Sequence, residues 1–197
     1  MTDQRTTSKF ASSGLGLLLT LLLVACATAT PYQPNIPGQK VSGGYSEEYL
    51  GENRYRVRFS GNTLTSRDTV EGYLLYRAAE LTIQNGYDWF SMTDHTTERD
   101  RRTYVEPFPR YSPWYGPGYR YWRPHWNYYR GGVWNSWHPY GGDPFWAYNL
   151  DVRTVERFEA EAEIIMHKGS KPANETRAFD ARQVISDLGP TIKWPES

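Results

Sequence analysis

NRYRVRFSGNTLTSRDTVEGYLLYRAAELTIQNGYDWFSMT, residues 53–93, decides the fold. Its first eight residues, 53–60, alternate apolar side chains with Arg54, Arg56 and Arg58. Alternation with a period of two is typical of a strand that has one buried and one solvated face. Three arginines on one face are explained either by an anionic partner or by neighbouring strands that carry acids. We expect the second explanation.

The rest of this stretch predicts a helix and another strand. The helix is expected over 65–81, where Thr65 or Ser66 is a suitable N-cap and apolar residues follow one helical stripe. An Asn-Gly pair after the helix supplies a left-handed stop. Residues 87–93 have the composition of a strand, so the predicted order is strand, helix, strand.

A second periodic stretch lies near the carboxyl end. Over 146–167 the even positions are mainly apolar and many odd positions are charged, which predicts one long strand or two strands joined at a bulge near 154–156. A turn at 168–174 then leads to a short helix over 180–188, which a Gly-Pro pair ends. Together the elements predict an α+β fold: a small, mainly antiparallel sheet with two helices on one face and a long irregular insertion.

The amino terminus has the basic, apolar and small residues of a secretory signal, in that order. Its strongly apolar core, 15–25, is shorter than the roughly 20 residues of a membrane-spanning helix. LVAC at 23–26 resembles the lipobox of bacterial lipoproteins. The resemblance implies a signal peptide over 1–25, cleavage between Ala25 and Cys26, and acylation of Cys26 with chains such as palmitate. An ordinary signal peptide and an uncleaved helix are the alternatives.

The residue after the cysteine bears on the destination. By resemblance to Gram-negative sorting, Ala27 in place of aspartate implies the outer membrane, with the domain facing the periplasm, and makes the inner membrane the second choice. Residues 26–46 are rich in proline and glycine, so we expect a lipidated flexible tether there. A single domain is then expected over 47–197.

The cysteine count and the net charge exclude some classes of function. The chain has one cysteine, so the sequence excludes an internal disulfide and a thiol pair for redox exchange. Residues 1–25 hold two basic residues and one acid, and their removal leaves the mature chain close to neutral. A neutral exported chain argues against a nucleic-acid partner.

Three stretches carry a wider resemblance. NRYRVRFSGN at 53–62, TVEGYLLYRAAELTIQNGYDWF at 69–90 and EAEAEIIMHKG at 159–169 resemble a family of uncharacterised proteobacterial lipoproteins. The resemblance covers most of the mature chain outside its middle segment. It implies the lipoprotein localisation and the α+β fold, and it implies no activity, catalytic residue or ligand.

The middle segment, residues 104–146, is dominated by tryptophan, tyrosine, proline and glycine. No period of 2 or 3.6 survives, so we predict neither a strand nor a helix there. Irregular insertions of this length are typically functional or disordered. The candidate binding residues of the segment are Trp114, Trp122, Trp126, Trp134, Trp137, Arg120 and Arg123.

Several interpretations of this aromatic segment stay open. Its rings stack on the sugars of peptidoglycan or another envelope glycan, or they contact a protein, because Trp, Tyr and Arg dominate binding hot spots. Alternatively they lie at a lipid interface, where Trp and Tyr accumulate, or they fold back over the open sheet face without a ligand. We expect a binding or structural module that contacts an envelope protein or peptidoglycan.

The sequence favours binding over catalysis. It has no HExxH motif, GxSxG elbow or phosphate-binding loop, so no catalytic residue, metal ligand or cofactor is assigned. Asp94-His95 is expected to be part of a polar loop. Glu159, Glu161 and Glu163 line one strand face and are the carboxylates that the alternative function, a periplasmic cell-wall glycan hydrolase, would require.

Overall fold

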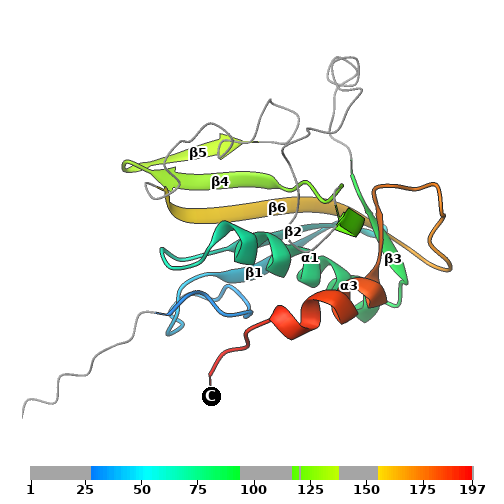
Figure 1. Cartoon of the computed structure of the whole chain (residues 1–197), viewed down its shortest axis with the longest axis horizontal. Helices are drawn as coiled ribbons and strands as arrows, with labels where there is room; N and C mark the ends of the chain where they lie inside the picture. The colour runs from blue at the N-terminus through cyan, green and yellow to red at the C-terminus, as the bar shows by residue number, and fades with distance from the viewer. Residues whose placement is uncertain (1–27, 94–116, 120, 138–154, 197) are drawn as a thin grey trace, which may run out of the picture.

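The computed structural model describes residues 28–93, 117–119, 121–137 and 155–196. They form a seven-stranded, mainly antiparallel sheet and two α-helices (Figure 1), which confirms the predicted α+β class. In chain order the elements are β1 (Gly44–Gly51), β2 (Arg54–Ser60), α1 (Arg67–Gln84), β3 (Trp89–Met92), β4 (His125–Arg130), β5 (Val133–Trp137), β6 (Val155–His167), β7 (Ala178–Asp180) and α3 (Ala181–Leu188), with single 3₁₀ turns at Pro117–Tyr119 and Gly189–Thr191.

Strand β6 is the centre of the sheet. One edge of β6 pairs with β2, and the other edge pairs with β4 along its first half and with β3 along its second half. Strands β1, β5 and β7 extend the sheet beyond β2, β4 and β3. Residue 156 is skipped in the pairing, because Tyr129 opposes Arg157 while Arg130 opposes Val155. This irregularity confirms the bulge predicted near 154–156, whereas the strand predicted upstream of it lies outside the described residues.

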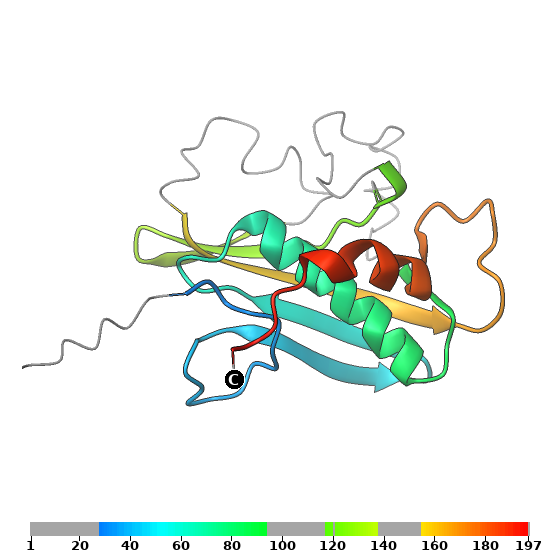
Figure 2. The same ribbon diagram turned by 60° about the horizontal axis from the view of Figure 1, so that its bottom comes forward.

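The helices cover one face of the sheet. Figure 2 shows α1 lying across β2 and β6, with α3 beside it on the same face. Helix α1 begins at the predicted cap, where the Ser66 hydroxyl accepts a hydrogen bond from the Thr69 amide, and it ends before Gly86, whose φ is +77°. The core lies between helices and sheet, and the even positions of β6 point into it, namely Phe158, Ala160, Ala162, Ile164 and Met166.

The tether predicted at 26–46 is wrong for the part that is described, residues 28–46. Tyr32 is 1% exposed and its ring packs edge-on against Tyr73 and Tyr76 of α1. Its amide donates to the Lys193 carbonyl at 2.7 Å. The segment has no apolar period because isolated contacts of Tyr32, Thr30 and Gln33 hold it, so its composition resembled a linker.

A polar cluster around the buried Tyr32 and Arg77 fixes this amino-terminal segment. The Tyr32 hydroxyl donates to Glu80 Oε2 at 2.6 Å, and Arg77 joins Glu80 at 2.5 Å to Glu47 of β1 at 2.9 Å. The Arg77 guanidinium also lies 4.2 Å above the Tyr45 ring. Burial and the bond to Glu80 raise the pKa of Tyr32 far above its usual range. The cluster therefore makes residues 28–46 part of the domain.

The prediction that the aromatic segment has no regular structure is also wrong where the segment is described. Strands β4 and β5 form a hairpin through Gly131 and Gly132, whose φ angles are +58° and +81°. A two-residue turn with two positive φ angles is the type I′ turn that suits the twist of a hairpin. The alternation of these strands is hidden because aromatic residues stand on both of their faces.

Candidate functional site

The sheet has a second face that no helix covers in the described part of the chain. It presents the odd positions of β6, together with the residues of β2 and β4 that stand opposite them. Because the helix-covered face is filled by the core, the side chains of this open face are the candidates for contact with other molecules.

Ion pairs between β2 and β6 occupy the middle of the open face. Arg56 lies 2.7 Å from Glu48 and 2.5 Å from Glu163 between nitrogen and oxygen. The hydrogen bond to Glu163 is the main cause that raises the pKa of Arg56. We call this group the arginine–glutamate ladder; its members are Arg54, Arg56, Arg58, Glu48, Glu159, Glu161 and Glu163.

The ladder confirms that acids neighbour the arginines of β2. The ladder also contains the three glutamates that a glycan hydrolase would use. A general acid of such an enzyme needs an apolar site that keeps it protonated. Each of these carboxylates lies within 3.6 Å of a guanidinium nitrogen. Glu159 also accepts a hydrogen bond from the Ser60 hydroxyl at 2.6 Å. These contacts give the hydrolase alternative no support.

Beside the ladder, the hairpin presents two aromatic rings. Tyr129 and Trp134 stand opposite each other across β4 and β5, with ring centroids 5.4 Å apart and planes inclined by 60°. They belong to the open face, because Tyr129 pairs with the odd residue Arg157 of β6. Trp134 is 51% exposed. We call Tyr129 and Trp134 the aromatic platform.

Polar side chains adjoin the aromatic platform one step along the same face. Asn127 and Ser136 are also cross-strand partners, and the Ser136 hydroxyl donates to Asn127 Oδ1 at 2.7 Å. The Asn127 amide group donates to Glu159 Oε1 at 3.3 Å, which connects the hairpin with the ladder. The open face therefore has an apolar patch with hydrogen-bonding groups at its margin, an arrangement typical of contact surfaces.

The other candidate binding residues are placed differently. The structure corrects the prediction for Trp122 and Trp126. Both side chains are buried in the core and are not free to contact a partner. Trp122 meets Phe90 and Phe179 edge-on, and Trp126 meets Phe158 in the same way. Successive side chains of a strand point to opposite faces of the sheet. Trp126 therefore faces the helices, while Tyr129 and Trp134 face outwards.

The two remaining described candidates are only half-buried. Trp137 packs against the edge of the core. The Arg123 amide lies 3.3 Å from the sulfur of Met92, at the point where the chain returns to the sheet. The residues outside the described part of the chain are Ala25, Cys26, Asp94, His95, Trp114 and Arg120.

Sequence reasoning missed one pair on the open face. Ser91 Oγ of β3 and His167 Nε2 of β6 are 3.0 Å apart, and the His167 ring stacks on Trp89 with centroids 3.9 Å apart. Burial lowers the pKa of His167, and the negative charge of Glu175 opposes that shift. In the described residues no carboxylate is hydrogen-bonded to His167, which is the contact that orients the imidazole in a catalytic triad. Only strand register brings these two positions together, and no local motif signals it.

Two further observations concern metal binding and membrane-spanning helices. No group of His, Cys, Asp and Glu side chains in the described ranges is placed to hold a metal ion. Among the helices of the described chain, none is both long enough and apolar enough to cross a membrane.

Comparison with protein-family models, curated proteins and solved structures finds no match to this chain. The resemblance to proteobacterial lipoproteins therefore stays a prediction that rests on the residues quoted above.

Proposed function

We propose that the protein is a lipid-anchored lipoprotein of the outer membrane, facing the periplasm, that binds an envelope protein through its aromatic platform. The LVAC motif at 23–26 supports the anchor. The observation that carries the binding role is Trp134, which stands half exposed beside Tyr129 on the sheet face that none of the described helices covers.

The exposure of Trp134 contrasts with the deeper burial of the other tryptophans of its hairpin. Trp126 on the neighbouring strand is 1% exposed, whereas Trp134 leaves about half of its surface in water. Exposed apolar surface that is held in a fixed orientation costs free energy in solution and is recovered when a partner covers it. The hairpin holds both rings in register, so a partner meets a surface that is already ordered.

The surroundings of the platform favour a protein over a charged polymer. In the ladder each guanidinium lies beside a carboxylate, so this part of the face does not attract an anion by net charge. Aromatic residues at the centre and polar groups at the margin match the anatomy of protein interfaces. Asn127, Ser136 and the exposed Arg157, which pairs with Tyr129, supply that margin.

The test of this surface is site-specific photo-crosslinking in cells. We expect p-benzoylphenylalanine in place of Trp134 to form an adduct with an envelope protein, and the same group in place of Trp194 to form none. Trp194 is a matched control because it is 57% exposed and packs on Tyr32, far from the hairpin in sequence. With the identified partner, Trp134→Ala should weaken binding about tenfold, equivalent to roughly 1.4 kcal/mol.

Peptidoglycan is the competing partner, and the same variants test it. A soluble form without the lipidated cysteine, residues 27–197, is sedimented with purified sacculi beside its Trp134→Ala and Trp194→Ala variants. Sedimentation that depends on Trp134 would replace the protein partner with a glycan. A platform that neither crosslinks nor sediments would contradict the proposal.

The lipid anchor has its own test. Cys26→Ala should leave the unprocessed precursor or release the protein from the membrane, because only a thiol accepts the thioether-linked lipid. Membrane fractionation and the mass of the mature protein provide the readout. Unchanged attachment with an unchanged mature mass would contradict the lipoprotein assignment.

A further inference from the structure

The fold leaves almost no free chain between the proposed anchor and the domain. The Thr28 carbonyl accepts a hydrogen bond from the Asn62 side chain at 2.7 Å. The buried Thr30 donates its amide to Thr65 Oγ1 at 2.8 Å. Cys26 precedes Thr28 by two residues, which span at most about 7 Å. A lipid on Cys26 would therefore hold this part of the domain against the bilayer surface.

Several surface segments meet at the end of the molecule where the described chain begins. Figures 1 and 2 both place the turn before α1, the tip of the β4–β5 hairpin and the loop before β1 at this end, on the left of each view. Asn62 and Thr65, which hold the amino-terminal segment, belong to the turn before α1. The strands run from this end towards the opposite one.

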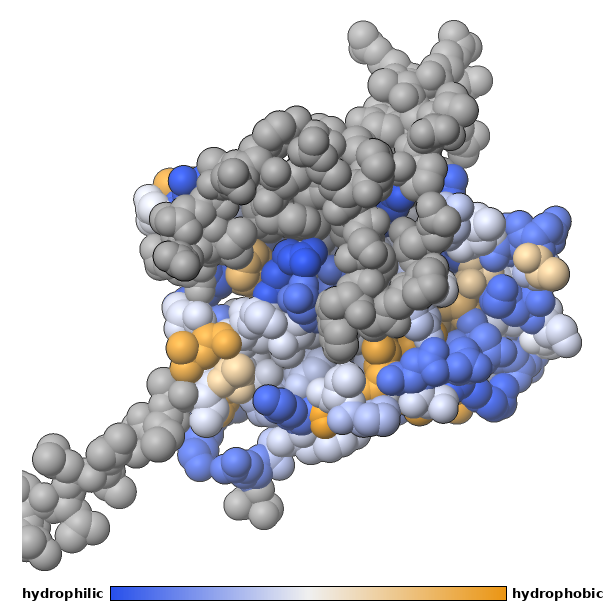
Figure 3. Space-filling model, in the orientation of Figure 1, coloured by the Kyte–Doolittle hydropathy of each residue, from blue (hydrophilic) through white to orange (hydrophobic). Residues whose placement is uncertain are grey.

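The same end exposes large aliphatic side chains. Leu64 in the turn before α1 and Val133 at the hairpin tip are each more than half exposed. They are two of the six large hydrophobic residues that are exposed in the described ranges. Figure 3 shows apolar surface over the hairpin tip and beside the point where the chain enters. These two residues are called the apolar end.

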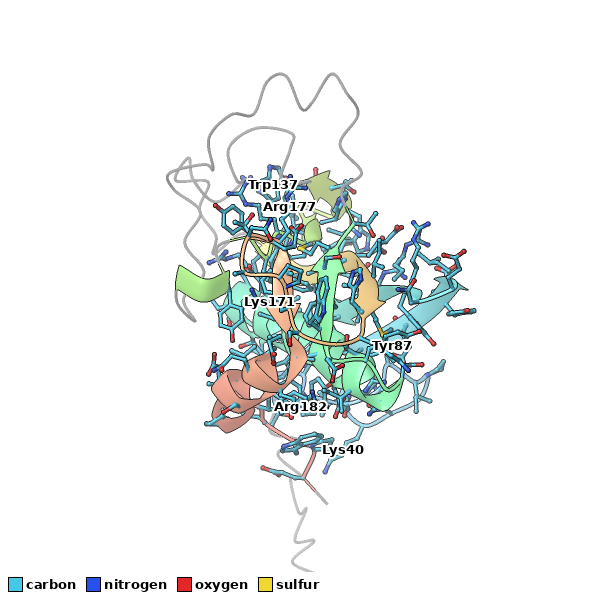
Figure 4. All side chains as sticks on the ribbon, turned by 90° about the vertical axis from the view of Figure 1, so that its right-hand side faces the viewer. Lys40, Tyr87, Trp137, Lys171, Arg177 and Arg182 are labelled. Carbon is cyan, nitrogen blue, oxygen red and sulfur yellow. The ribbon has the colours of Figure 1, made fainter. Side chains whose placement is uncertain are left out.

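The opposite end has a different character. Figure 4 views it directly, and Lys171, Arg177 and Arg182 are labelled there. The loop between β6 and β7, residues 168–177, reads KGSKPANETR and contains no large apolar residue. Asp88 at this end is bound by Arg182 at 2.9 Å. We call this the charged end after its loop, although the Tyr49 ring near the end of β1 is also exposed there, at 60%.

We propose that Leu64 and Val133 rest in the headgroup region of the bilayer that carries the anchor. This inference rests on the proposed lipoprotein function. A covalent anchor makes the second contact intramolecular, so a few aliphatic side chains suffice to orient the domain. Lys40 in the loop before β1 and Arg130 beside the hairpin turn add positive charges for anionic headgroups. The strands then stand away from the membrane, and the aromatic platform lies close to it.

The test measures the depth of labelled side chains on vesicles. Processed lipoprotein, with Cys26 occupied by lipid, carries Leu64→Cys or Val133→Cys labelled with an environment-sensitive nitrobenzoxadiazole dye. It is reconstituted in vesicles of phosphatidylethanolamine and phosphatidylglycerol that contain a headgroup-proximal doxyl quencher. Ser170→Cys, exposed in the loop at the charged end, is the matched control. We expect blue-shifted, quenched emission at positions 64 and 133 and neither effect at 170.

The outcomes separate this inference from the proposed function. Protein that floats with the vesicles while its dyes at 64 and 133 stay unquenched would overturn the membrane contact and leave the anchor intact. Protein that does not float, or whose Cys26 reacts with the dye, would overturn the lipoprotein proposal itself. A dye on Ser136→Cys reports on the platform, and quenching there would make lipid the occupant of the platform in place of a protein.

Discussion

The two faces of the β4–β5 hairpin are built from the same kinds of residue and have opposite roles. On the inner face Trp126 packs against Phe158 under the helices, whereas on the outer face Trp134 is half exposed beside the half-buried Tyr129. Composition does not distinguish the two sets. The Gly131–Gly132 turn sets the register, and the register decides which rings become core and which become surface.

The largest effect that sharpens this comparison is expected for Trp126→Ala. Removal of a buried tryptophan leaves a cavity and should lower the free energy of unfolding by about 3–5 kcal/mol. Trp134→Ala should change it by no more than about 0.5 kcal/mol, because half of that ring is already in water. Denaturant unfolding of residues 27–197 measures both. Equal losses would show that the two faces do not differ.

The amino-terminal segment extends the comparison to tyrosines. Tyr32→Phe removes the hydroxyl that donates to Glu80 at 2.6 Å, and we expect a loss of about 2 kcal/mol. Tyr49→Phe, at an exposed ring of β1, is the control and should cost well under about 1 kcal/mol. An equally small effect of Tyr32→Phe would support the prediction of a flexible tether.

Alkaline pH provides a second measurement on Tyr32. The folded state raises the pKa of Tyr32, so the folded chain keeps the phenol protonated where the unfolded chain ionises. The stabilisation is complete below the unfolded value of about pH 10 and is lost as pH rises above it. Unfolding free energies between about pH 8 and pH 11 should therefore fall less steeply for Tyr32→Phe than for the wild type.

A smaller effect is expected at the hairpin turn. Gly132 has a φ of +81°, and a methyl group added at its Cα would meet open space, so Gly132→Ala costs only the strain of a left-handed backbone, about 1 kcal/mol. Serine at 170, which is exposed in another loop, is the comparison, and Ser170→Ala should be neutral. An unchanged stability of Gly132→Ala would mean that the turn does not set the register.

The smallest effect concerns His167 on the open face. Because burial lowers its pKa, the folded chain favours the neutral ring, and this contribution is present above about pH 6.5 and lost as pH falls below it. His167→Gln should therefore lose less stability than the wild type between about pH 7 and pH 5. The same pH dependence in both proteins would show that titration of His167 does not contribute to the free energy of unfolding.

Sequence was sufficient where one face was apolar and the other charged. Strands β2 and β6 have that contrast, so strand β2 and the core positions of β6 were predicted. Helix α1 is buried around most of its circumference, and its cap and its Asn-Gly stop helped to predict it. Sequence reasoning failed where contrast was missing. Tyr32 is an isolated anchor without a repeat, and the hairpin has rings on both faces, although its Gly-Gly turn between aromatic runs was a usable signal.

The candidate site was predicted in part for the same reason. Trp134 and Trp126 were equal candidates in the sequence, and only strand pairing separates them. The Ser91–His167 contact joins residues 76 positions apart, which no local pattern encodes. Assignment of the surface therefore required the three-dimensional register.

Hydroxyl-radical footprinting of the mature chain tests the central claim most directly, because mass spectrometry reports the oxidation of each tryptophan separately. We predict that Trp134 is oxidised readily while Trp122 and Trp126 are protected, and that the identified partner protects Trp134 alone among the three. Equal oxidation of Trp126 and Trp134 in the free protein, or a bound partner that leaves Trp134 unprotected, would contradict the account.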